Sequence, residues 1–157
     1  MRNNKLVTIG RIILVLAPLI AFNTAFAEWK LLQNSPTNYD LHSVFFLDDS
    51  TGWIAGDNST IYKTTNSGES WVQQTSPEVS NFQCITFVNA DTGWACGTAG
   101  VVIKTTNGGA NWFSQTFTGI KFNSLDFIDA NTGYICGING IIWKTINGGT
   151  NWVNQPT

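Results

Sequence analysis

The residues of this 157-residue chain that could do acid–base chemistry are mostly aspartates. Asp57 and Asp126 are candidates for the two carboxylates, roughly 5 to 10 Å apart, that glycoside hydrolysis needs. The remaining aspartates of the repeats described below lie in turns: Asp48, Asp49, Asp91 and Asp129. A carboxylate in a turn caps local backbone N–H groups far more often than it catalyses. The pattern therefore predicts no catalytic residue in this chain.

Metal and nucleophile chemistry has little support in the sequence. His42 is the only histidine, so a Ser-His-Asp triad would depend on it alone, and its place before a strand favours an edge position instead. His, Cys and Asp residues do not cluster with metal-ligand spacing. We therefore expect neither a metal site nor a cofactor.

Three cysteines, Cys84, Cys96 and Cys136, leave at least one thiol unpaired within a single chain. Cys96 and Cys136 occupy the same place in neighbouring repeats, where we expect a separation beyond the roughly 7 Å Cα limit of a disulfide. Pairing of Cys84 with Cys96 depends on a strand register that the sequence leaves open. We expect all three cysteines to act as small buried apolar side chains.

The N-terminus has the organisation of a signal peptide. Basic residues precede an apolar run over residues 12–22, and Ala25-Phe26-Ala27 supplies an A-x-A cleavage site. The run is shorter than the about 20 residues of a membrane span. Residues 1–27 are therefore predicted to be removed on export to the periplasm or the extracellular space, without membrane insertion after cleavage. An uncleaved anchor is the alternative.

Beyond residue 27 the chain is acidic and contains no arginine. Five lysines and ten acidic residues give a net charge of −5. Nucleic acids and acidic membranes select basic patches, so both are disfavoured as partners. Lys63, Lys104 and Lys144 recur at one repeat position and are expected to flank a hairpin rather than form a ligand patch.

A repeat of about 40 residues organises the chain. Gly52, Gly93 and Gly133 are 41 and 40 residues apart, and each begins a short apolar run bounded by turn residues. Four such runs per repeat are typical of propeller blades. We predict an all-β fold of three four-stranded antiparallel blades at about residues 41–75, 82–116 and 122–155. A further strand at 29–33 resembles the last strand of a blade.

Each repeat contains a box with the pattern Thr-x-Asn-x-Gly-x-x-Trp. The Asn mimics a turn, the Gly accepts positive φ, and the Trp covers the turn while its indole N–H keeps a polar partner. These residues are predicted to be structural: Thr64, Asn66, Gly68, Trp71, Thr105, Asn107, Gly109, Trp112, Thr145, Asn147, Gly149 and Trp152. A second aromatic position, Trp53, Trp94 and Tyr134, is predicted to pack between blades.

Three blades are fewer than the four to eight that close a propeller. Either the chain is the N-terminal piece of a longer propeller, which we favour, or several copies associate through exposed blade faces. The chain on its own is then expected to be oligomeric or poorly soluble.

The box resembles the Asp-box, or bacterial neuraminidase repeat, with Asn in the usual Asp position. The segment from Asp91-Thr92-Gly93-Trp94 to Trp112 is similar to the repeat of the photosystem II stability and assembly factor family. That resemblance implies a seven-bladed propeller with chaperone-like binding of newly made reaction-centre protein through an Arg-rich patch. The absence of Arg departs from this pattern, and it also departs from the Arg triad that resemblance to sialidases would imply.

If the chain has a binding surface, we expect it on the loops that differ between repeats, including Asp57, Asn58, Thr98 and Asn139, because recognition usually lies on variable loops of a rigid scaffold. Sequence drift of solvent-facing loops explains the same variation equally well. The sequence thus predicts a non-enzymatic, exported β-propeller scaffold that binds protein or glycan. The alternative is an N-terminal fragment of a secreted Asp-box propeller glycoside hydrolase.

Overall fold

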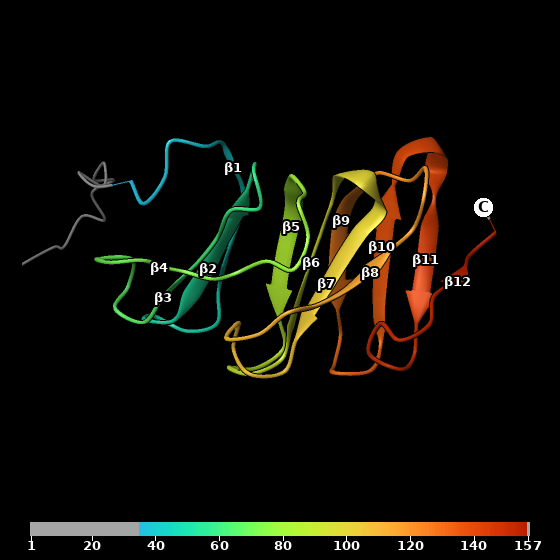
Figure 1. Cartoon of the computed structure of the whole chain (residues 1–157). Helices are drawn as coiled ribbons and strands as arrows, with labels where there is room; N and C mark the ends of the chain where they lie inside the picture. The colour runs from blue at the N-terminus through green and yellow to red at the C-terminus, as the bar shows by residue number, and fades with distance from the viewer. Residues whose placement is uncertain (1–34, 157) are drawn as a thin grey trace, which may run out of the picture. The chain divides into compact units, whose positions relative to one another are not determined.

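The computed structural model describes residues 35–156. The predicted signal peptide and the predicted strand at 29–33 lie outside these residues. Within them, twelve strands form three antiparallel sheets of four strands each, which confirms the predicted all-β blade architecture (Figure 1).

Each sheet consists of four strands that are consecutive in the sequence, and we call the sheets blades 1, 2 and 3. Blade 1 contains β1 (Leu41–Phe46), β2 (Gly52–Gly56), β3 (Ile61–Thr64) and β4 (Val72–Gln73). Blade 2 contains β5 (Phe82–Phe87), β6 (Gly93–Gly97), β7 (Val101–Thr105) and β8 (Phe113–Thr116). Blade 3 contains β9 (Phe122–Phe127), β10 (Gly133–Gly137), β11 (Ile142–Thr145) and β12 (Val153–Asn154).

The last strand of each blade begins one residue after the Trp of the box, at Val72, Phe113 and Val153. The reason is that this Trp belongs to the turn. A Cβ atom built on Gly68 would lie 3.5 Å from the ring of Trp71, so the indole packs over the glycine of its own box.

Two 3₁₀ turns, η1 (Thr98–Gly100) and η2 (Ile138–Gly140), connect the second and third strands of blades 2 and 3. Their middle residues, Ala99 and Asn139, have φ of 58° and 60°. Among the described residues, no helix is long and apolar enough to cross a membrane.

Apolar side chains fill the space between neighbouring blades. One cluster, including Trp53, Phe82 and Ile103, joins blades 1 and 2, and a second, including Trp94, Phe122 and Ile135, joins blades 2 and 3. Blade 2 thus contributes to a buried interface on each of its two faces. Blades 1 and 3 each contribute to one.

Candidate functional site

The boxes are turns whose polar groups bond one another. In blade 2, the hydroxyl of Thr105 accepts hydrogen bonds from the N–H groups of Asn107 (3.2 Å) and Gly109 (2.9 Å). It donates to Oδ1 of Asn107 (3.0 Å), which accepts from the N–H of Asn111 (2.8 Å). Equivalent bonds close the other two boxes. The box side chains therefore build the turn and leave little polarity for a ligand.

One part of the predicted box chemistry is wrong. The indole N–H groups of Trp71, Trp112 and Trp152 are buried without an acceptor among the described residues. In blades 2 and 3 a carbonyl of the box instead accepts from a tryptophan of the preceding blade. Trp53 Nε1 donates to the Gly108 carbonyl oxygen, 3.4 Å away, in the box of the next blade.

The contact between Trp53 and the next box recurs one blade further on. Trp94 Nε1 donates to the Gly148 carbonyl oxygen at 3.1 Å. Both indoles are fully buried, and both stack on a phenylalanine of the following blade, with centroid distances of 3.6 Å to Phe87 and 3.5 Å to Phe127. The aromatic position predicted to pack between blades thus combines stacking with a directed hydrogen bond in these two copies.

A lysine lies directly opposite each of these rings on the neighbouring strand. Lys63 Nζ is 4.9 Å from the Trp53 ring centroid, and it also donates to the Gly108 carbonyl oxygen at 3.2 Å. Lys104 Nζ is 5.2 Å from the Trp94 ring centroid, and burial lowers the pKa of Lys104. We call each Trp with its Lys a clamp. Sequence reasoning missed the clamp, although the constant spacing of both residue types carries its signal.

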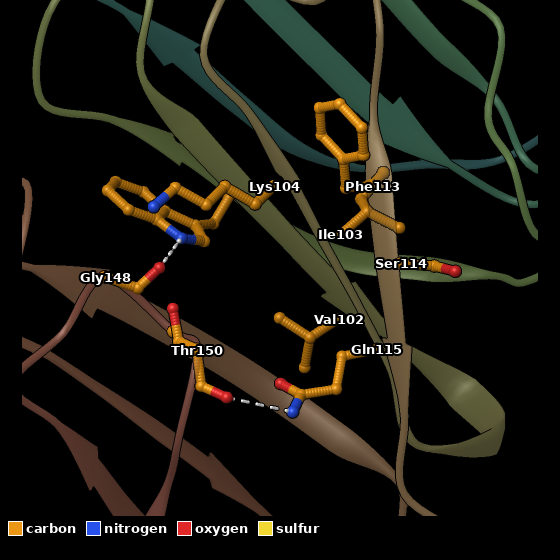
Figure 2. A pocket seen from close by; sticks show the side chains of 10 residues that line it. Val102, Ile103, Lys104, Phe113, Ser114, Gln115, Gly148 and Thr150 are labelled. Carbon is orange, nitrogen blue, oxygen red and sulfur yellow. Dashed lines mark hydrogen bonds between the residues drawn. The ribbon is translucent and has the colours of Figure 1, made fainter.

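A cleft of about 250 Å³ opens beside the clamp of blade 2, at the junction with the box of blade 3 (Figure 2). Its wall combines the exposed end strand β8 with the box glycines. Gln115 Nε2 donates to the Thr150 carbonyl oxygen at 3.3 Å across the cleft, while Gln115 Oε1 is buried without a partner among the described residues. Phe113 is 66% exposed at its rim. The lining residues are Trp94, Val102, Ile103, Lys104, Phe113, Ser114, Gln115, Gly148, Gly149 and Thr150.

The loop residues predicted to bind ligands are partly tied to one another. Asp57 Oδ1 lies within hydrogen-bond distance of His42 Nε2, at 2.8 Å. Asn58 and Thr98 both form hydrogen bonds with Asn81. The Asn58 N–H donates to Asn81 Oδ1 (3.1 Å), and the Asn81 N–H donates to Thr98 Oγ1 (3.1 Å). Asn139 is exposed in η2 of blade 3. None of these four residues lines the cleft beside β8.

The carboxylates are distributed over different blades. Asp57 belongs to the turn after β2 in blade 1, whereas Asp126 lies on β9 in blade 3, where it lines a smaller hollow with Tyr134 and Cys136. Within residues 35–156, His, Cys, Asp and Glu form no group of three that could hold a metal ion.

Two of the turn aspartates cap backbone. Asp48 Oδ1 accepts from the N–H groups of Ser50 (2.8 Å) and Thr51 (2.7 Å), and these bonds lower the pKa of Asp48. Hydrogen bonds from the N–H groups of Thr132 and Asn131 likewise lower the pKa of Asp129. In blade 2 the residue that caps this turn is Asn89, whose Oδ1 accepts from the N–H groups of Asp91 and Thr92, and not Asp91.

The prediction that the cysteines are buried is wrong for Cys136, which is exposed. It is confirmed for Cys96, which is buried, and this burial raises the pKa of the Cys96 thiol. The reason is their position: Cys96 lies on the covered face of blade 2, and Cys136 lies on the equivalent but uncovered face of blade 3. Cys84, half-buried, is the direct cross-strand partner of Cys96, and all three thiols are free.

Comparison with known proteins identifies the repeat. The family model described as "Photosynthesis system II assembly factor YCF48" matches residues 21–119. No curated protein sequence matches the chain.

Solved structures with the same fold include a YCF48 bound to D1 peptide, with a TM-score of 0.70 and 23% identity over 78% of this chain and 43% of that one. YCF48 from Cyanidioschyzon merolae gives a TM-score of 0.67 and 25% identity over 77% of this chain and 38% of that one. An ancestral GH74 enzyme gives 0.61 and 22% identity over 82% of this chain and 19% of that one.

This chain therefore spans about two-fifths of the length of the YCF48 structures. The family match covers more than half of its residues. The chain belongs to the photosynthesis system II assembly factor YCF48 family.

Proposed function

We propose that this protein is a non-enzymatic, exported β-propeller scaffold that binds an extended segment of another polypeptide during protein assembly. Membership of the assembly-factor family supports the binding role, and a solved relative holds a D1 peptide. The sequence features of residues 1–27 support export.

The observation that carries the proposal is the cleft beside β8. This strand ends its sheet, so it has a strand neighbour on one side only, and at four residues it is longer than β4 or β12. A free strand edge offers backbone N–H and C=O groups to an extended peptide, and pockets beside it select side chains. The cleft supplies such a pocket.

The chemistry of the cleft suits a peptide. Phe113 offers an exposed apolar surface. The Ser114 hydroxyl already donates to Glu78 Oε1 at 2.6 Å, and Gln115 Oε1 is a buried acceptor without a partner among the described residues. Lys104 contributes a cation beside these groups. The lining residues themselves include no carboxylate, histidine or cysteine, which are the side chains that most often act as general acids, bases or nucleophiles. Among the described residues, the one carboxylate bonded to a lining residue is that of Glu78, which accepts from Ser114. Their side chains therefore favour binding over catalysis.

A fluorescence anisotropy titration tests the proposal. The probe is a labelled synthetic peptide with the D1 sequence, and the same residues in scrambled order serve as its control. We expect the D1 peptide to bind, and Phe113→Ser to weaken its binding at least tenfold, because burial of a phenylalanine is worth about 1.5–3 kcal/mol and about 1.4 kcal/mol is tenfold.

The matched control variant is Val72→Ser, which changes the exposed residue at the same repeat position of blade 1 and should leave the affinity unchanged. Equal binding of the scrambled peptide, or equal loss in the two variants, would contradict the proposed site. Release of reducing ends from a β-glucan by the purified chain would instead favour the glycoside hydrolase alternative.

A further inference from the structure

Two cysteines face each other directly across the first hairpin of blade 2. Cys84 of β5 and Cys96 of β6 are cross-strand partners in an antiparallel pair. Opposite residues of such a pair have Cα atoms about 4.5–5.5 Å apart, and their side chains leave the same face of the sheet. Disulfides join residues whose Cα atoms are about 4.4–6.8 Å apart. The backbone therefore already holds the two cysteines at the spacing of a disulfide.

Among the three described blades, only blade 2 has this pair. The same two repeat positions hold Ser43 opposite Ala55 in blade 1. In blade 3 they hold Ser124 opposite Cys136. The fold does not require sulfur at these positions, since serine and alanine occupy them in the same strand register. The distinguishing property of blade 2 is that both positions carry a thiol at once.

The surroundings of the pair allow the two sulfur atoms to meet. The strand register shifts directly before Cys84, so Cys84 lies at the end of the regular ladder, where a small backbone shift disturbs few paired residues. The Cys84 thiol donates to the Leu125 carbonyl oxygen at 3.4 Å and accepts from the Ser124 hydroxyl at 3.9 Å, and both are weak hydrogen bonds. Burial, and after it the charges of Cys84 and Cys136, raise the pKa of the Cys96 thiol, and such charge effects act between close groups.

We propose that Cys84 and Cys96 form an oxidation site, at which a disulfide-bearing oxidant converts the two thiols into a cross-strand disulfide. Cys84 reacts first, because it is half-buried whereas Cys96 has no exposed surface. The Cys84 thiolate attacks one sulfur atom of the oxidant, which forms a mixed disulfide and releases one thiolate. The Cys96 thiolate then attacks Cys84 Sγ and displaces the second thiolate.

The reaction needs no further electron acceptor. Two protein thiols are oxidised to one disulfide, and the oxidant disulfide is reduced to two thiols, which take up the two protons that the cysteines lose. A small molecule such as glutathione disulfide, or the disulfide of a thiol–disulfide oxidoreductase, supplies the same chemistry.

Oxidation also changes the contact between blades 2 and 3. The reaction removes the S–H proton of Cys84, so the hydrogen bond to the Leu125 carbonyl oxygen is lost, while a covalent bond joins the first two strands of blade 2. Disulfides persist in exported proteins. The use of this site in the cell therefore rests on the export that is part of the proposed function, whereas the chemistry of the two thiols does not.

Mass spectrometry of the purified, reduced chain tests the proposal. The chain is incubated with excess glutathione disulfide, and its remaining thiols are alkylated in urea. We expect neither alkylation nor bound glutathione at Cys84 and Cys96. A protease that cuts before Asp91 separates these two cysteines, so an unreduced digest should contain one disulfide-linked pair of peptides, which dithiothreitol separates.

The repeat itself supplies the matched variants. Cys84→Ser copies the residue of blades 1 and 3, and Cys96→Ala copies the residue of blade 1. Neither variant should form the linked pair, and the cysteine that remains of the pair should be alkylated or hold glutathione. Cys136→Ser is the control and should form the linked pair as the wild type does. Circular dichroism should show the wild-type spectrum for all three variants.

Alkylation of both Cys84 and Cys96 in the oxidised wild type would overturn the proposal. A glutathione that stays bound to Cys84 would overturn it as well, because Cys96 would then have failed to displace it. A disulfide that links either residue to Cys136 would have the same consequence. None of these measurements involves peptide binding, so a failure of the proposed binding function and a failure of this proposal are distinguishable.

Discussion

Blade 2 and blade 3 have nearly the same sequence pattern and the same four-stranded topology, yet they bury different fractions of equivalent residues. Trp94 and Cys96 of blade 2 are fully buried, whereas Tyr134 and Cys136 of blade 3 are exposed. The sheet pairing is the same in both, so the hydrogen-bonded sheet does not cause the difference. A neighbouring blade causes it, and most apolar burial in this molecule is therefore acquired between blades.

The largest expected effect comes from removing a covered clamp ring. Trp94→Ala should lower the free energy of unfolding by about 3–5 kcal/mol, because it deletes a fully buried ring that stacks on Phe127 and bonds Gly148. Tyr134→Ala should cost below about 1.5 kcal/mol in dilute solution, because its ring is 38% exposed. Urea unfolding of both variants checks this. Equal losses of unfolding free energy would show that a covering blade does not determine how much this aromatic position stabilises the fold.

A second comparison uses glycines of the same repeat position. Gly100 and Gly140 have φ of 71° and 73°, so alanine at either one costs about 1–2 kcal/mol of backbone strain. An added Cβ on Gly100 would also overlap the Phe117 carbonyl oxygen, whereas nothing lies within 4 Å of one on Gly140. Gly100→Ala should therefore lose about 1–3 kcal/mol more than Gly140→Ala by thermal unfolding. A larger loss at Gly140 would contradict this order.

A third experiment tests whether the stability of a box also depends on the neighbouring blade. Thr105→Val and Thr145→Val should each cost about 1–3 kcal/mol, because each leaves two backbone N–H groups without their acceptor. The two losses in urea should agree, since these bonds are internal to one box. A loss in blade 2 that is several times the loss in blade 3 would mean that the box, too, depends on a neighbour.

The smallest expected effect concerns acid stability. The folded-state pKa of Asp129 is below its ordinary value of 3.8, so its contribution to stability is present above pH 3.8 and is lost as the pH falls from there through the lower folded value. Asp129→Asn should preserve the turn, as Asn89 does in blade 2, and should flatten this part of the pH dependence. Urea midpoints measured between pH 5 and pH 2 test this, and an unchanged slope would refute it.

The spacing of Gly, Trp and the box residues was sufficient to predict the three sheets, because strands and tight turns are determined by nearby residues. The contacts between blades could not be predicted this way. The acceptor of Trp53 lies 55 residues away in Gly108, and its identity depends on how one blade is placed against the next. For the same reason the exposure of Cys136 was missed, and the register of Cys84 with Cys96 had to come from the structure.

The cleft beside β8 escaped sequence reasoning as well. Phe113, Ser114 and Gln115 match their counterparts in the other repeats well enough to be interpreted as ordinary strand residues. Their distinguishing property is their position beside Gly149 and Thr150 of the following box, a juxtaposition that the repeat pattern alone does not describe.

The clamp also affects how a protein of this kind can gain or lose repeats in evolution. Its donors, Trp in both junctions and Lys63 in one, come from one repeat, but its acceptor is a backbone carbonyl of the next box, at a position that has positive φ in all three described boxes. A duplicated repeat therefore inherits a compatible neighbour at the moment of duplication, without any compensating mutation. Unequal recombination between repeats can lengthen or shorten the array by whole blades while every internal junction stays intact.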